Sequence, residues 1–260
     1  MIVCPNAKIN IGLEVVSKRP DGFHDLETVF YPVVELRDVL EVVKAGSFDL
    51  VQYGLPCDCP VEKNLCYKAY KAVKERFDID PVNIYLYKNI PMGAGLGGGS
   101  ADAAFTIMAL NEVFGLGLDK AQRAGIAAGL GSDCPFFIYN RPMLAHGRGE
   151  VLEPLDLDLS PYRIEVVTPG LHISTAEAYA GVDALKFTPA TADVYSPEPL
   201  ALRLKKDILQ WRECVVNDFE AVAFAKYPAL EDIKKDLYAS GAAYASMTGS
   251  GSAFYGLFAK

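Results

Sequence analysis

A run of glycines between Pro91 and Ser100 is the feature of this sequence with the clearest chemical use. Five glycines stand in the seven residues from 93 to 99, directly before a segment with helical spacing that starts at Ala101. Glycine lets the backbone turn through positive φ and come close to a ligand. Successive amide N–H groups can then point into one concavity at the positive end of a helix. This arrangement suits a phosphate group and uses more glycine than a tight turn requires.

Three known kinds of glycine-rich phosphate loop make different demands on the sequence. A Walker A loop needs Lys and then Ser or Thr after its last glycine, but serine and alanine follow here. Gly93, Gly95 and Gly98 do fit the G-x-G-x-x-G pattern of dinucleotide-binding folds. The strand before them alternates in polarity, however, and the acid about 20 residues later falls in or just after a helix. No His-Arg-Asp or Asp-Phe-Gly follows, which excludes a eukaryotic-type protein kinase.

A second glycine-rich segment runs from 247 to 252 as Met-Thr-Gly-Ser-Gly-Ser, between two stretches that are typical of strands. A simple hairpin loop explains this composition. Its glycines and hydroxyl groups could equally add hydrogen-bond donors beside a phosphate, and the residues alone leave both interpretations open.

Lys8 and Asp133 are single charged residues in otherwise uncharged runs, 1–13 and 124–139. A lysine in such a run can extend its amine to solvent along an apolar strand. An aspartate before Cys-Pro can be a helix N-cap or a turn residue. Asp102, after the glycine loop, is expected to interact with the helix macrodipole rather than with a metal. The residues alone do not separate these structural roles from a catalytic one.

The elements that must position these residues alternate between strand and helix patterns. Period-two alternation predicts half-buried strands over 9–15, 29–33 and 82–86. Helical spacing predicts helices over 64–77, 101–114, 119–130, 208–224 and 230–238, with Gly241 placed to end the last one. The proline-rich stretch 188–199 is expected to be a loop. Interleaved helices with alternating strands favour an α+β fold over a doubly wound parallel sheet. A boundary near 154–161 divides the chain into domains 1–155 and 156–260.

Composition narrows the range of partners. The 260 residues are 51% hydrophobic and carry 25 basic against 33 acidic side chains, a net charge of −8 with a pI near 5.0. Such a chain is globular rather than disordered. Its negative charge is a poor match to a polyphosphate backbone, so we expect no nucleic-acid partner, while a small anionic ligand can still bind at a local positive site.

The location of the protein is predicted from its first residues and its cysteines. Residues 1–8 lack the basic start and the apolar stretch of a secretory signal, and the charge-free run 237–259 is too polar and too rich in glycine for a membrane span. Six scattered cysteines are then expected to be reduced thiols in the cytoplasm. Cys57-Asp58-Cys59 lacks a second Cys/His pair with zinc spacing, so no metal is expected there.

Three motifs spread along the chain make it similar to the GHMP kinases, which include galactokinase, homoserine kinase and mevalonate kinase. They are residues 5–11 (Pro-Asn-Ala-Lys-Ile-Asn-Ile), the glycine loop 91–100, and residues 248–251 (Thr-Gly-Ser-Gly). Within that family the chain most resembles the kinases of the non-mevalonate isoprenoid pathway that act on a cytidine diphosphate substrate. The segments that carry this closer resemblance are 19–28, 131–137, 147–150, 169–170 and 217–220.

The resemblance implies an enzyme that transfers the γ-phosphoryl group of ATP to the 2-hydroxyl of a methylerythritol unit carried on cytidine diphosphate. It also implies a two-domain α+β fold, with a left-handed β-α-β crossover in the N-terminal ATP domain and a ferredoxin-like C-terminal domain. Mg²⁺ is expected to screen the ATP phosphates, and no dedicated protein cage for it is visible. Oligomeric state is not predicted.

By similarity, each site residue takes a role. Asp133 is the base that accepts the hydroxyl proton, and Lys8 touches the acceptor hydroxyl and the γ-phosphate. Phe23 and Tyr179 stack on the cytosine while His24 hydrogen-bonds to its edge; the family more commonly has Tyr and Phe at these two ring positions, so the phenol oxygen is moved. Ser100 caps a helix or binds phosphate or Mg²⁺. The resemblance assigns ATP to Asn64, Pro91, Met92, Gly93, Ala94, Gly95, Leu96, Gly97, Gly98, Gly99 and Ser100, and the acceptor or its phosphates to Asn10, Thr175, Gly249 and Ser250.

Overall fold

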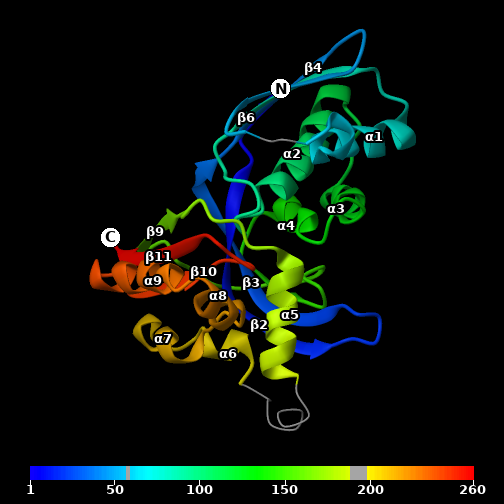
Figure 1. Ribbon diagram of the computed structural model, residues 1–260. Helices are drawn as coiled ribbons and strands as arrows, with labels where there is room; N and C mark the ends of the chain where they lie inside the picture. Colours follow the sequence, from blue (N-terminus) through cyan, green and yellow to red (C-terminus); the bar gives the residue numbers. More distant parts are fainter. Residues whose placement is uncertain (57–58, 188–197) are drawn as a thin grey trace. The chain divides into compact units, whose positions relative to one another are not determined.

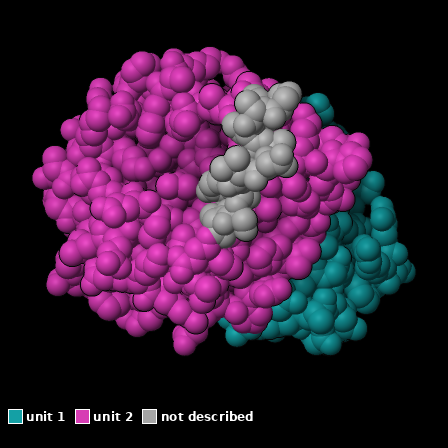
Figure 2. All heavy atoms as spheres, turned by 90° about the horizontal axis from the view of Figure 1, so that it is seen from below, with its two compact units in different colours: residues 1–8, 32–92, 97–141 teal, residues 9–31, 93–96, 142–260 magenta. Residues whose placement is uncertain are grey.

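The computed structural model describes residues 1–56, 59–187 and 198–260. By packing, the chain forms two compact units, each built from several segments (Figure 2). The first unit comprises residues 1–8, 32–92 and 97–141, and the second comprises 9–31, 93–96 and 142–260. This division differs from the single boundary at 155/156 placed by sequence, which stays a prediction about domains. Two long strands, β2 (Asn6–Lys18) and β3 (His24–Arg37), belong in part to each unit. A single boundary in the sequence therefore cannot separate the two units.

The first unit is a four-stranded sheet with helices packed on it (Figure 1). Its strand order is β1-β4-β6-β5, in which only the β5–β6 pair is parallel. The helix after the glycine loop, α2, packs against α1 and β4. The elements are β1 (Ile2–Val3), β4 (Val39–Lys44), β5 (Asp49–Gly54), η1 (Val61–Lys63), α1 (Leu65–Phe77), β6 (Val82–Lys88), α2 (Gly98–Phe114), α3 (Lys120–Ala128) and α4 (Cys134–Tyr139).

The second unit contains an antiparallel three-stranded sheet, β10-β11-β9, with α9 packed on β10 and β11 (Figure 1). Helix α8 packs against α9 and α5. Strands β7 and β8 extend the β2–β3 pair into a four-stranded sheet. The elements are β7 (Met143–His146), β8 (Val151–Pro154), β9 (Tyr162–Val167), α5 (Thr175–Lys186), α6 (Leu200–Arg203), η2 (Ile208–Gln210), α7 (Trp211–Cys214), α8 (Phe219–Lys226), α9 (Ala229–Ala239), β10 (Tyr244–Met247) and β11 (Phe254–Ala259).

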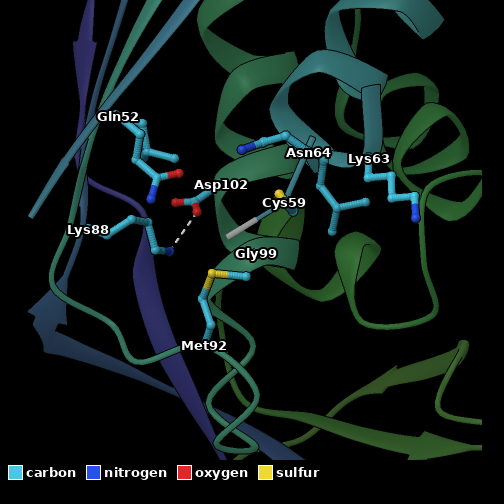
Figure 3. A pocket seen from close by; sticks show the side chains of 10 residues that line it. Gln52, Cys59, Lys63, Asn64, Lys88, Met92, Gly99 and Asp102 are labelled. Carbon is cyan, nitrogen blue, oxygen red and sulfur yellow. Dashed lines mark hydrogen bonds and ion pairs between the residues drawn. The ribbon is translucent and has the colours of Figure 1, made fainter. Parts of the chain in front are cut away.

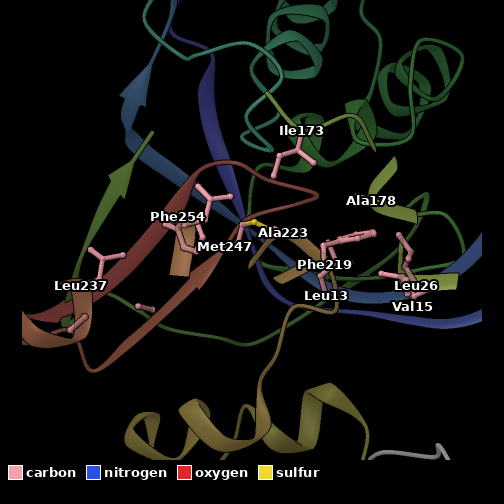
Figure 4. Packing of buried hydrophobic residues seen from close by; sticks show 14 of the residues in the cluster. Leu13, Val15, Leu26, Ile173, Ala178, Phe219, Ala223, Leu237, Met247 and Phe254 are labelled. Atoms are coloured by element: carbon pink, nitrogen blue, oxygen red, sulfur yellow. The ribbon is translucent and has the colours of Figure 1, made fainter. Parts of the chain in front are cut away.

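The core of the second unit joins its strands to its helices (Figure 4). Leu13 and Val15 of β2, Phe219 of α8 and Leu237 of α9 meet Phe254 of β11 in one buried cluster. Their periodic spacing in the sequence is what turns these side chains to a common interior. Among the described residues, no helix is both long and apolar enough to cross a bilayer.

Most predicted elements are confirmed. The alternating strands lie within β2, β3 and β6, and four helical patterns correspond to α1, α2, α3 and α9. Gly241 follows α9 at a φ of 97°, and the amide of Ala242 donates to the carbonyl of Leu237, which closes the helix end as expected. The α+β class is confirmed, while the predicted loop 188–199 lies largely outside the described residues.

The single helix predicted over 208–224 is wrong. The segment forms η2, α7 and α8, and residues 215–217 between α7 and α8 are not helical, with Val215 extended. This break exchanges hydrogen bonds with β2: the Leu13 amide donates to the Val216 carbonyl at 2.8 Å, and the Asp218 amide donates to the Leu13 carbonyl at 2.9 Å. Tertiary pairing therefore overrides a helical spacing that continues through the break.

Candidate active site

Lys8 and Asp133 form an ion pair in the first unit, with 3.4 Å between Lys8 Nζ and Asp133 Oδ2. The Lys8 side chain is 5% exposed, so it does not extend to solvent from its strand. Asp133 directly precedes α4 at the N-cap position, yet its side chain makes no capping hydrogen bond. Its carboxylate is one-third exposed and accessible to a ligand. The structural roles that the sequence left open thus fit these two residues poorly.

The charge on Lys8 is held in a desolvated place. Burial lowers the pKa of Lys8, because removing water disfavours the ammonium form, while the Asp133 carboxylate raises the same pKa and offsets part of that effect. An ammonium group that is poorly hydrated and only partly balanced interacts strongly with any additional negative charge that approaches it.

The glycine loop divides into two kinds of conformation. Gly93, Gly95 and Gly97 have φ values of 67°, 81° and 71°. The helix after the loop begins at Gly98, three residues before the predicted start at Ala101. Gly98 and Gly99 therefore form the first helical turn instead of the loop, and their amides are among the first four of α2, which have no partner within the helix. Such amides are a general binding site for anions.

Close contacts at two of these glycines tie the loop to the other motifs. A Cβ at Gly97 would lie 3.0 Å from Lys8 Cγ, and a Cβ at Gly95 would lie 2.1 Å from the carbonyl oxygen of Thr248. The Thr248 hydroxyl donates to the Gly95 carbonyl at 3.2 Å and accepts from the backbone N–H of Asn10 at 2.9 Å. Residues far apart in the sequence, from all three motifs, thus lie in contact with one loop.

Segment 247–252 connects β10 and β11, as predicted, and two residues that sequence analysis gave no role hold it in place. Asn217 donates from its amide to the carbonyls of Met247 and Gly249, both at 2.9 Å. Glu220 accepts from the Met247 amide at 2.8 Å. The signal was present, because residues 217–220 belong to the motifs that carried the family resemblance. Their partners could not be read from spacing.

A pocket in the first unit lies beside the start of α2 (Figure 3). It has about 170 Å³ of space, and Leu65, Leu86 and Met92 give it an apolar wall. Asn64, Met92 and Gly99, which were predicted to bind ATP, all line it, together with Gln52, Cys59, Lys63, Lys88 and Asp102. Asn64 also caps α1, since its side-chain oxygen accepts from the Cys66 amide at 2.9 Å. An apolar pocket with polar groups at its margin suits a flat base.

Asp102 does not play the macrodipole role expected of it. It is buried in the second turn of α2, where Lys88 Nζ lies 2.7 Å from its Oδ2, and Lys88 also bonds to buried Asp38. Asp102 Oδ1 has no hydrogen-bond partner among the described residues. Burial, reinforced by the nearby Asp38 carboxylate, raises the pKa of Asp102 to about 7 against the opposing effect of Lys88. The Asp38 carboxylate accepts hydrogen bonds from the backbone amides of residues 89 and 90, whereas Asp102 Oδ1 accepts none.

The residues predicted to bind the cytosine lie in the second unit. His24 is buried and stacks on Tyr179, with ring centroids 4.7 Å apart and planes 20° from parallel. Phe23 is 52% exposed, and the Arg148 guanidinium lies 4.8 Å from its ring centroid. His24 Nε2 is 2.6 Å from Asp183 Oδ1, a contact that sequence analysis did not anticipate. Of the two rings predicted to stack on the cytosine, Phe23 has exposed surface for a planar ligand, while one face of Tyr179 is already covered by His24.

The remaining residues predicted to bind the acceptor substrate make hydrogen bonds within the second unit. The hydroxyl oxygens of Thr175 and Ser250 are 3.1 Å apart. The Asn10 side-chain amide donates to the Thr28 hydroxyl at 3.0 Å. Gly249 has a φ of 58°, and a Cβ there would lie 3.0 Å from the Gly95 Cα, so this position requires a residue without a side chain.

A metal would have to be held with few protein ligands. No group of three or more His, Cys, Asp or Glu side chains that could bind a metal exists among the residues described. Ser100 lies in the first turn of α2. Its hydroxyl oxygen is a donor of the type that Mg²⁺ accepts, and Mg²⁺ usually completes its coordination with phosphates and water. Ser100 is therefore compatible with a phosphate-bound Mg²⁺.

Comparison with known proteins gives the same family from several directions. The model of the GHMP kinases N-terminal domain matches residues 64–141, and that of the GHMP kinases C-terminal domain matches 200–260. The 4-diphosphocytidyl-2-C-methyl-D-erythritol kinase of Parabacteroides distasonis is 48% identical over 260 residues, covering all of this chain and 92% of that protein. The protein of the same name from Caldanaerobacter subterraneus is 41% identical over 97% of this chain and 86% of its own length.

Solved structures agree with these matches. The crystal structure of a 4-(cytidine 5'-diphospho)-2C-methyl-D-erythritol kinase matches with a TM-score of 0.78 and 36% identity, over 99% of this chain and 90% of that one. The Methanococcus jannaschii mevalonate kinase has a TM-score of 0.72 at 13% identity, over 99% and 90% of the two chains, a likeness of fold alone. With its length covered by such relatives and both family domains present, the chain belongs to the GHMP kinases.

Proposed function

We propose that this chain is an ATP-dependent kinase that phosphorylates the 2-hydroxyl of 4-diphosphocytidyl-2-C-methyl-D-erythritol. The observation that carries the proposal is its identity of 46–48% over 99–100% of the chain to several kinases of that name. The ion pair of Lys8 with Asp133 supports it, because an alcohol must lose a proton and develop negative charge as it attacks phosphorus.

In the proposed reaction, the acceptor oxygen forms a bond to the γ-phosphorus and the bond from that phosphorus to the β,γ-bridging oxygen breaks, which releases ADP. Asp133 takes the hydroxyl proton, and the Lys8 ammonium stabilises charge on the acceptor oxygen and on the transferred group. Phosphoryl transfer needs mainly positioning and charge stabilisation from the protein. The loop amides and the first turn of α2 would bind the phosphates, and the pocket beside Asn64 would take the adenosine.

The ATP phosphates are expected to carry Mg²⁺, with the Ser100 hydroxyl as its protein ligand. When bound, Mg²⁺ neutralises part of the phosphate charge.

On the acceptor side, Phe23 and Tyr179 are proposed to contact the faces of the cytosine and His24 its edge. Asn10, Thr175, Gly249 and Ser250 are proposed to bind the acceptor or its phosphates. The partner implied is thus a small cytidine diphosphate alcohol. A cytoplasmic location also stays a prediction.

The direct test is ADP release by the purified chain with ATP and Mg²⁺ in the presence of one alcohol at a time. We expect release with 4-diphosphocytidyl-2-C-methyl-D-erythritol, and product phosphorylated at the 2-hydroxyl. Turnover only with homoserine or a mevalonate derivative would instead make it another GHMP kinase. ATP binding without turnover on any of them would indicate a nucleotide-binding protein without catalysis.

A further inference from the structure

The ring of His24 is held by a carboxylate as well as by stacking. Its Nε2 lies 2.6 Å from Asp183 Oδ1, and the His24 side chain is 7% exposed. Asp183 stands four residues after Tyr179 on α5, so both side chains lie on the same face of that helix. The helix therefore supplies both the ring that packs on the imidazole and the group that meets its edge.

Both oxygens of Asp183 are used. Lys18 Nζ lies 2.5 Å from Oδ2 while His24 occupies Oδ1. Partial burial acts to raise the pKa of Asp183, but the hydrogen bonds from Lys18 and His24 outweigh it and hold that pKa below its ordinary value. Asp183 is then an ionised carboxylate, and an ionised carboxylate can only accept hydrogen bonds.

This geometry determines where the imidazole hydrogen sits. Because Asp183 only accepts, Nε2 must donate, and a neutral imidazole has one N–H and one acceptor nitrogen. Nδ1 is therefore left as an acceptor. Nδ1 has no hydrogen-bond partner among the residues that the structure describes, so its lone pair is not used within that part of the chain.

We infer that Asp183 is a positioning residue for base selection: it fixes the Nε2–H tautomer of His24, so that Nδ1 accepts a hydrogen bond from the 4-amino group of cytosine. That amino group is the only N–H donor on the exposed edge of cytosine, whereas uracil has a carbonyl oxygen at the same place. The Nδ1 lone pair would accept a hydrogen bond from the 4-amino group of cytosine. In uracil it would instead face the lone pairs of a carbonyl oxygen. The inference rests on the proposed function for its ligand, but the tautomer itself does not.

The two partners of Asp183 provide a selective test. In Asp183→Asn, the single side-chain oxygen is expected to stay with Lys18, which turns the amide N–H₂ toward Nε2. Nε2 must then accept, and the hydrogen moves to Nδ1. In the double variant Lys18→Met with Asp183→Asn, the amide is free to turn its oxygen to Nε2–H, which restores the original tautomer. A purely structural role for Asp183 predicts no such reversal, since Asn has the same size.

The tautomer is read from nitrogen-15 NMR of the full chain at about pH 8.5, where an ordinary imidazole is neutral. The His24 signal is assigned by its loss in His24→Gln. We expect hydrogen on Nε2 in the wild type, on Nδ1 in Asp183→Asn, and on Nε2 again in the double variant and in Lys18→Met alone. Hydrogen on Nδ1 in the wild type, or an unchanged tautomer in Asp183→Asn, would overturn the inference.

Binding of CMP and UMP, measured by calorimetry on the same variants, tests base selection. We expect the wild type to favour CMP by about 10-fold to 100-fold, the cost of one buried unpaired polar group. Asp183→Asn should lose that preference and the double variant should regain it. A preference that does not follow the tautomer would overturn the role in selection. Because the NMR measurement needs no substrate, failure of the kinase assay alone would count against the proposed function and not against the tautomer.

Discussion

At the scale of single residues, Lys8 combines a charge with almost complete burial. A desolvated ammonium 3.4 Å from one carboxylate is a strong partner for a second anion, which is the charge that a phosphoryl acceptor develops. The same burial makes the charge easier to lose, since it lowers the pKa of Lys8. Activity that requires the ammonium form of Lys8 should therefore fall at alkaline pH.

We predict that kcat declines at alkaline pH as Lys8 loses its proton. The midpoint of this decline should lie below pH 10.5, the ordinary pKa of a lysine. The sign follows from the lowered pKa: the charged form is present below it and is lost as the pH rises through it. The profile of kcat against pH measures this. In Lys8→Arg the alkaline decline of kcat should be absent over the pH range in which the protein stays folded, because a guanidinium stays charged. This holds even if kcat of the variant is lower at every pH. An alkaline limb that is the same in both proteins would argue against Lys8 as its source.

At the scale of elements, the junction of the glycine loop with α2 sets the position of Lys8. Gly97 is the N-cap of α2 with a φ of 71°, and a Cβ there would lie 2.9 Å from Phe137 Cζ and 3.0 Å from Lys8 Cγ. A side chain at 97 must therefore adopt a left-handed conformation and displace two packed groups.

Gly97→Ala is predicted to lower the free energy of unfolding by about 1–3 kcal/mol and to reduce kcat as well. The thermal midpoint and the ADP assay measure the two effects. The matched control is Gly125→Ala, inside α3 with no atom near the added Cβ, which should stabilise the protein by about 0.5–1 kcal/mol. Gly97→Ala with unchanged stability and rate would contradict this account of the junction.

The buried Asp102 makes the stability of the protein depend on pH. Its pKa rises from 3.8 to about 7 on folding, so between these values the folded state holds a proton that the unfolded state has lost. Stability from this group is fully present below pH 3.8 and is lost progressively as the pH rises from 3.8 to about 7. Asp102→Asn, which is neutral at every pH, should gain in melting temperature relative to the wild type as the pH rises over that range, with no further gain above about 7. Exposed Asp80→Asn should instead give a curve parallel to the wild type, and a parallel curve for Asp102→Asn would refute the raised pKa.

Elements whose burial repeats with local spacing could be predicted from the sequence, and those fixed by distant partners could not. The pattern of α1 is set by its own buried face, so its range is correct within one residue. The break at 215–218 depends on hydrogen bonds to β2, some 200 residues away. Asp102 was assigned from its helix alone, whereas its partners Asp38 and Lys88 lie on other segments. The residue pattern within one segment does not predict contacts with segments distant in the sequence.

At the scale of the whole molecule, residues predicted to bind a ligand occur in each of the two units. Lys8, Asp133 and the base pocket belong to the first unit, and His24, Tyr179 and segment 247–252 belong to the second. Motifs shared with a family identified these residues, because their separation in sequence gives no geometric signal. Sequence could not supply the supporting contacts of Asn217, Glu220 and Asp183, which depend on the folded chain.

The second unit depends on its buried cluster for stability. Phe254 is fully buried, and its ring stacks against Phe224 with 12° between planes. Phe254→Ala is predicted to lower the free energy of unfolding by about 3–5 kcal/mol, through lost burial and the cavity left behind. Denaturant unfolding measures it. The control Leu209→Ala removes a side chain that is 68% exposed and should change stability by less than about 0.5 kcal/mol. Equal effects of the two changes would contradict the assigned core.

The role of Asp133 as the catalytic base is tested by kcat of Asp133→Asn with ATP, Mg²⁺ and the cytidyl substrate. Because the Asp133 side chain makes no capping hydrogen bond, the fold should persist, and loss of the base should lower kcat by about 100-fold to 10,000-fold. Asp119→Ala is the control: it removes a carboxylate that does cap a helix, so it should cost about 1 kcal/mol of stability and leave kcat unchanged. A folded Asp133→Asn protein with near wild-type kcat would contradict the assignment of Asp133 as the base that acts beside Lys8.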